Sequence, residues 1–106
     1  MKRYRVLING TNFQMPFELP ERILKLRRMG FHTMVFVTAP SPQKAEFRAV
    51  AVLQRDKNLC AAIRNAKDDP PKLFVEEIHE IESFRGCRRP RSGLAFYVER
   101  GPKRTR

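Results

Sequence analysis

The sequence has few of the residues on which metal sites, disulfide frameworks and membrane segments depend. It contains two cysteines, two histidines and no long apolar run among its 106 residues. Its longest hydrophobic stretches are far shorter than the roughly 20 residues that a membrane-spanning helix needs. The first ten residues, MKRYRVLING, also lack the apolar segment and small-residue cleavage site of a secretory signal. We therefore expect a cytoplasmic protein with no membrane segment.

The two cysteines, Cys60 and Cys87, are too few to form a zinc site by themselves. His32 and His79 could complete a set of four ligands, but their spacing matches no local zinc motif. Without a secretory signal, two free thiols are expected rather than a disulfide bond. The sequence predicts neither a metal nor a cofactor.

The chain also has no phosphate-binding loop, nucleophile elbow, His-Glu metal pair or Cys-His pair. His79, between Glu77 and Glu80, is the nearest approach to an acid–base cluster, although a solvated strand face explains the same residues. A ribonuclease would need His32, His79 and an arginine such as Arg85 to converge. We predict no catalytic residues and a non-enzymatic protein. A small basic nuclease or toxin-like enzyme is the alternative.

Positive charge is in large excess, with 22 Lys and Arg against 11 Asp and Glu and a net charge of +11. Both ends of the chain are basic, and such charge attracts nucleic acid at low salt. Arginine clusters beside aromatic rings indicate a nucleic-acid surface, although here they could serve solubility alone. The predicted contacts come from the basic loop, the segment before the central strand and one tyrosine: Arg85, Arg88, Arg89, Arg91, Arg27, Arg28 and Tyr97.

One internal segment, residues 67–84, is acidic. Its strand, Lys72 to Phe84, could meet the basic residues of a second copy of the chain. Opposite charges on two sheet edges would favour a homodimer formed by extension of the sheet. The two predicted partners are therefore nucleic acid and a second copy.

The strongest pattern in the chain runs from Phe31 to Asp56. Residues 31–39 are rich in Val, Phe and Thr, which predicts a central strand covered on both faces, with His32 as a core histidine. Ser41 and Pro42 then begin a helix, Ser41 as its cap. The helix has an apolar stripe that is expected to pack on a sheet, with a partner-binding groove as the alternative: Ala45, Ala49, Val52 and Leu53, widened by Phe47 and Val50.

The flanking segments read mostly as strands. Residues 4–8 form a first strand, Asn9-Gly10 predicts a hairpin turn, and residues 11–15 form a second short strand. Residues 19–29 are either a helix or extended, with extended favoured. Leu59 to Ala66 form a helical turn with Cys60 and Ile63 inward. Lys72 to Phe84 form an edge strand with a bulge near residues 77–80, and Leu94 to Val98 form the last strand.

Together these elements predict an α+β fold. An antiparallel sheet of four to five strands carries one main helix packed on one face. Residues 1–100 form a single domain, and residues 101–106 form a basic, disordered tail.

Three blocks of the sequence resemble a family of small uncharacterised bacterial proteins. The blocks are RVLINGTNF, GFHTMVFVTAPSPQKAE, and DPPKLFVEEIHEIESF with GLAFYVE, and together they cover about half of the chain. This resemblance implies no activity and no site. The order of strands, APSPQKAE turn and helix is also similar in topology to the HicB-type antitoxins. That similarity implies a protein or nucleic-acid partner and carries over no residues.

Overall fold

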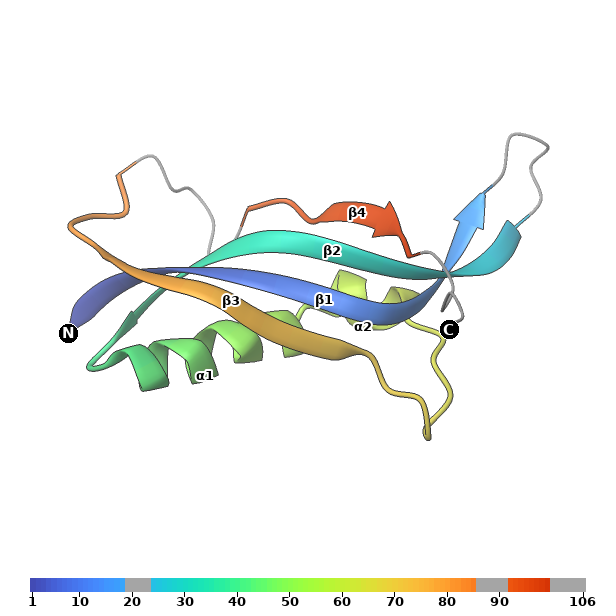
Figure 1. Cartoon of the computed structure of the whole chain (residues 1–106), viewed down its shortest axis with the longest axis horizontal. Coiled ribbons are helices and arrows are strands. Elements are labelled where there is room, and N and C mark those ends of the chain that lie inside the picture. The colour runs from blue at the N-terminus through green and yellow to red at the C-terminus, as the bar shows by residue number, and fades with distance from the viewer. Residues whose placement is uncertain (19–23, 86–91, 100–106) are drawn as a thin grey trace, which may run out of the picture.

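The computed structural model describes residues 1–18, 24–85 and 92–99. It has four antiparallel strands in one sheet and a main helix along one face, which confirms the predicted α+β fold (Figure 1). The strands lie in the order β3-β1-β2-β4. The elements are β1 (Lys2–Glu18), β2 (Leu24–Ala39), α1 (Pro42–Gln54), α2 (Lys57–Ala62), β3 (Lys72–Ile81) and β4 (Ala95–Val98). None of the helices in the described ranges is long and apolar enough to cross a membrane.

The long antiparallel pair of β1 and β2 forms the middle of the sheet. Its register runs from Lys2 opposite Ala39 to Glu18 opposite Leu24. Because side chains alternate along a strand, every second residue of each strand faces α1. On this face the two strands place their buried residues directly opposite one another, namely Tyr4 and Val37, Val6 and Val35, Ile8 and Thr33, and Phe13 and Met29.

The predicted turn at Asn9-Gly10 is wrong, because β1 continues through both residues. Gly10 lies opposite Phe31, and a Cβ atom on Gly10 would lie 2.8 Å from the ring of Phe13 and closer still to the ring of Phe31. The glycine is therefore needed for close packing of two rings rather than for a turn. The register shifts just beyond it, where Asn12 has a φ of 60°. Residues 11–15 continue β1 beyond this bulge.

β2 is a central strand, as predicted, but only one of its faces is covered. Phe31, Thr33 and Val35 are buried on the side of α1. On the opposite face, Met34 is half-buried and the side chain of His32 is 48% exposed. The prediction of a core histidine is wrong because the main helix packs on the other face. Residues 24–29 are extended, as favoured, and residues 19–23 lie outside the described ranges.

α1 begins where the sequence predicted. The hydroxyl of Ser41 accepts a hydrogen bond from the backbone N–H of Lys44 at 3.3 Å. Ala45, Ala49 and Leu53 are buried, and the two alanines let the helix backbone approach the sheet closely. Phe47 does not widen this stripe, because its side chain is 73% exposed. At 100° per residue it lies about 200° around the helix from both alanines.

The second half of the chain completes the sheet at both edges. β3 is an edge strand with a bulge, as predicted, although the bulge lies at Glu76, between the pairs Ile8–Val75 and Leu7–Glu77. α2 follows an Asp56 cap and buries Leu59. Cys60 is exposed rather than inward, because it follows the buried leucine by one residue and so points about 100° away.

β4 pairs with only four residues of β2. Tyr97 lies over Gly30, where a Cβ atom would come within 2.7 Å of the tyrosine ring. An aromatic ring laid on a strand glycine stabilises such a short edge strand. The Tyr97 hydroxyl accepts a hydrogen bond from Asn9 Nδ2 at 3.1 Å, and its ring stacks on His32 with centroids 5.7 Å apart. These contacts hold β4 against the middle of β2, at Met29 to His32.

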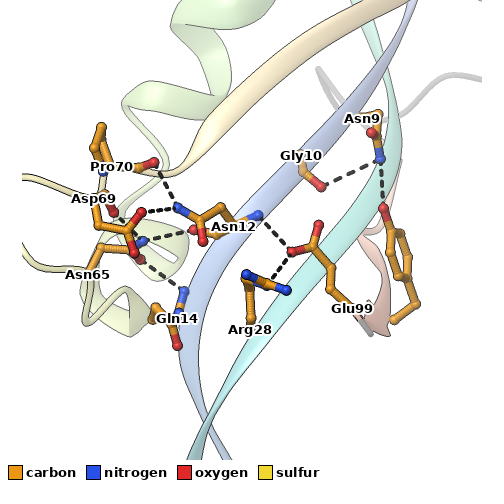
Figure 2. A network of polar contacts seen from close by, with 10 residues as sticks. Asn9, Gly10, Asn12, Gln14, Arg28, Asn65, Asp69, Pro70 and Glu99 are labelled. Carbon is orange, nitrogen blue, oxygen red and sulfur yellow. Dashed lines mark hydrogen bonds and ion pairs between the residues drawn. The ribbon is translucent and has the colours of Figure 1, made fainter. Parts of the chain in front are cut away.

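A polar network ties the bulge of β1 to the loop before β3 and to the end of β4 (Figure 2). Asn12 Nδ2 donates to Asp69 Oδ1 at 2.8 Å, and the backbone N–H of Asn12 donates to Glu99 Oε1 at 3.2 Å. Asn65 Nδ2 donates to the Asn12 carbonyl at 2.8 Å. Glu99 also pairs with Arg28, with Nε and Oε1 3.2 Å apart. The bulge is therefore fixed from both sides.

Gly10 and Gly30 provide a matched test of close packing. We expect Gly10→Ala to lower the free energy of unfolding by about 1–3 kcal/mol, because the new methyl group overpacks two buried rings. Gly30→Ala should cost much less, because Tyr97 is exposed and can move away. Urea denaturation of both variants measures the difference. Equal stabilities, or a larger loss for Gly30→Ala, would contradict this account of Gly10.

Asn12 provides a test of the backbone at the bulge. Both Asn12→Ala and Asn12→Gly remove the side-chain hydrogen bonds, but only alanine resists a φ of 60°. We expect the alanine variant to be less stable than the glycine variant by about 1 kcal/mol, the cost of the left-handed conformation. Thermal and urea unfolding would show this order. An alanine variant as stable as the glycine variant would mean that the bulge does not hold that conformation.

Candidate nucleic-acid interface

A groove with a volume of about 710 Å³ lies between α1 and the edge of β2. It forms because β4 pairs only with Met29 to His32, so that the rest of this edge has no partner strand among the described residues. The strand edge at Phe36–Thr38 lines one side of the groove, and α1 lines the other. Phe84, which follows β3, closes one end.

All charged side chains that line this groove are cations. Lys44, Arg48 and Arg55 form one stripe of α1, because their spacings of four and seven residues place them within about 40° of one another around the helix. We call these three residues the cationic stripe. The ion pairs among the described residues involve other cations, so no described carboxylate neutralises this stripe.

Arg48 links the two sides of the groove. Its Nη1 donates a hydrogen bond to the carbonyl oxygen of Thr38 at 2.6 Å. This bond holds the guanidinium group against the strand edge. A guanidinium has five N–H donors, so the bond leaves further donors for a ligand.

Three phenylalanines stand among these cations. Phe47 projects from α1 and is 73% exposed. Phe36 and Phe84 form a T-shaped pair with centroids 6.3 Å apart. Phe36 belongs to the face of β2 opposite α1, so the groove wraps around the strand edge. We call these three residues the aromatic lining.

The predicted contact residues do not come together in one site. Arg85 is exposed and directly follows Phe84, at the end of the groove. Arg27 and Arg28 lie eight or nine residues before Phe36 on β2, about 26–30 Å along the strand. Tyr97 packs near them, and Arg28 is engaged by Glu99. The other predicted arginines, Arg88, Arg89 and Arg91, lie outside the described residues, as does Cys87.

Sequence reasoning missed the cationic stripe and Phe47. It assigned Phe47 to the apolar stripe of the helix and did not single out the three cations. The stripe was visible as a spacing of four and seven residues, but the signal is weak, since many surface helices carry such spacings. Only the open edge of β2 beside the helix makes it a groove.

The residues that a ribonuclease would need are apart. His32 lies opposite Asn9 and His79 opposite Arg5, so the two histidines are about 13 Å apart along β1 and on different sides of it. His79 Nε2 is 3.0 Å from Glu77 Oε1, and His32 Nε2 is 3.7 Å from Glu76 Oε1. Within residues 1–18, 24–85 and 92–99, no group of His, Cys, Asp and Glu could hold a metal ion.

The acidic residues lie at the other edge of the sheet. Glu76, Glu77 and Glu80 are exposed on β3, which β1 separates from β2. The described residues carry 14 Lys and Arg against 10 Asp and Glu, a net charge of +4 of the total +11. Although the net charge is modest, charges of opposite sign are separated in space, with carboxylates at the β3 edge and the cationic stripe beside the β2 edge.

Comparisons of the chain with protein-family models, with curated proteins and with solved structures found no match. The resemblances noted from the sequence therefore stay predictions, and the function must be argued from the groove itself.

Proposed function

We propose that this protein is a small, non-enzymatic module that binds nucleic acid in the groove between α1 and the edge of β2. One observation carries the proposal: every charged group that lines the groove is a cation, and three aromatic rings stand among them. Lys and Arg bind phosphate groups, and the planar guanidinium fits two phosphate oxygens at once. Aromatic rings provide surfaces on which bases stack.

The distribution of charge supports the same conclusion. The cationic stripe has no described carboxylate partner, so a bound phosphate would not have to displace an ion pair. The carboxylates of β3 lie at the far edge of the sheet, where they repel a polyanion away from β3 and toward the groove. Arg85, which is exposed and directly follows the groove residue Phe84, adds a further positive charge.

A homodimer through a sheet edge is the other predicted partner, and its symmetric form, with two β3 strands side by side, is unfavourable. In a symmetric antiparallel pairing of two β3 strands, Glu76 and Glu77 of the two copies would come close to one another. Like charges opposite one another across a strand pair are destabilising. The carboxylates of β3 therefore act against the pairing of two β3 strands, and the pairing of β3 with basic residues of a second copy stays a prediction.

Charge reversal tests the proposed site. The variant Lys44→Glu/Arg55→Glu alters two cations of the stripe but leaves the Arg48–Thr38 hydrogen bond in place. Its control, Lys67→Glu/Lys72→Glu, makes the same change in net charge at two exposed residues outside the groove. Fluorescence anisotropy with labelled oligonucleotides between ~50 and ~300 mM salt measures both affinity and its salt dependence.

We expect the groove variant to lose at least about tenfold in affinity and to reduce the slope of log K against log salt by about 1–2, because two phosphate contacts are removed. The control should keep the slope of the unmodified protein. Equal losses in the two variants would show that binding follows net charge alone, and the groove would then not be the site.

A further inference from the structure

We propose that the nucleic acid in this groove is single-stranded. Its phosphates follow the cationic stripe of α1, and its bases stack on the aromatic lining. This inference rests on the proposed function and adds the class of ligand. The shape of the groove, the exposure of Phe47 and the outward backbone groups of the β2 edge each support it.

The shape of the groove argues against a duplex. A helix that reads duplex DNA projects its polar residues outward into the major groove. Here the cationic stripe instead faces the edge of a strand, and Arg48 is hydrogen-bonded back to that edge. A rigid duplex could contact only the rim, whereas a flexible single strand can enter the space between helix and strand.

The exposure of Phe47 favours a ligand that offers an open ring face. Its side chain is 73% exposed beside two cations, Lys44 and Arg48, and makes no ring contact with a described aromatic residue. The bases of a duplex are already stacked on their neighbours, so they offer no face to this ring. The bases of a single strand do, and stacking of this kind tolerates any base.

Among the described residues, no strand pairs with the edge of β2 beyond His32, and this edge offers backbone groups to the bases. The Met34 carbonyl accepts from the N–H of Ser92 at 2.8 Å, and the Met34 N–H donates to Ser92 Oγ at 2.9 Å. Both Met34 groups therefore point away from β1. Because backbone groups alternate along a strand, those of Phe36 point outward in the same way, into the groove. A donor and an acceptor thus lie beside the Phe36 ring, where the edge of a stacked base would come.

The length of the stripe suits an extended chain. Lys44 and Arg55 are 11 residues apart on α1, which is about 16 Å along the helix axis. The helix borders this whole length, and the strand edge at Phe36–Thr38 borders about 7 Å of it. A short run of unpaired nucleotides would therefore meet a cation at each end and a third, Arg48, about 6 Å from Lys44, with aromatic rings beside them.

The test compares single strands with duplexes and uses a matched pair of phenylalanine variants. Phe47→Ala removes the exposed ring of the groove, and Phe74→Ala removes a 50% exposed ring on β3, outside it. Because both rings are exposed, both variants should fold, and circular dichroism checks this. The probes are labelled RNA and DNA oligonucleotides of ~16 nucleotides and mixed sequence, each as a single strand and as a duplex. Affinities are measured at ~150 mM salt.

We expect single strands to bind more tightly than duplexes. Phe47→Ala should lower the affinity for single strands about tenfold, because one stacked base is lost. The affinity for duplexes should stay unchanged. Phe74→Ala should bind both as the unmodified protein does. The single strand with the higher affinity shows whether the groove selects RNA or DNA. A preference for either single strand over its own duplex supports the inference.

Two results would overturn the inference while leaving the proposed function intact. The first is a duplex that binds as tightly as a single strand. The second is a Phe47→Ala variant that binds single strands as tightly as the unmodified protein does. In both cases, binding must still be lost in Lys44→Glu/Arg55→Glu. Displacement of the oligonucleotide by polyglutamate at equal charge would show that the groove takes an acidic peptide. That result, or binding that survives the charge reversal, would overturn both proposals.

Discussion

The close packing of α1 on the β1–β2 pair is the interaction on which the other parts of this structure depend. Among the fully buried side chains, the largest are Phe31, Ile8, Leu53, Val6 and Val35, and all belong to these three elements. At about 2 kcal/mol each, their burial contributes on the order of 10 kcal/mol before the entropy of ordering the chain is subtracted. The alanines of α1 make this approach possible, because a larger side chain would hold the helix away from the sheet.

The same packing creates the candidate site. The main helix covers one face of the sheet and turns its opposite side, with Phe47, toward solvent. β4 is too short to cover the edge of β2, so the helix and that edge enclose a groove. Arg48 then joins the two sides through the Thr38 carbonyl. The groove is therefore a consequence of a short fourth strand and of the direction in which one helix faces.

Carboxylates and cations lie toward opposite edges of the sheet. Carboxylates gather on β3, at one edge, where they protect an unpaired strand from pairing with another copy. Cations gather on α1, beside the other edge. The electric field of this charge distribution orients a polyanion before contact, even though the net charge of the described residues is small.

The sequence by itself determined the elements and their class. Alternation marked the strands, the Ser41 cap and the alanine stripe marked α1, and the break in alternation marked the bulge of β3. Each of these signals is local, because it depends on the chain's own period and on hydrogen bonds between near neighbours.

The tertiary structure alone decided which distant residues contact one another and which face of the sheet the helix covers. Asn9-Gly10 is a typical turn sequence, but the pairing of β1 with β2 places Gly10 beneath the ring of Phe31. In the sequence, His32 is surrounded by apolar residues, as a core residue is. In the structure, it lies on the face of the sheet that the main helix does not cover. Phe36, Phe84 and Arg48 meet only because strands and helix far apart in sequence are brought together. Long-range register and the choice of covered face are properties of the whole chain, and no local pattern contains them.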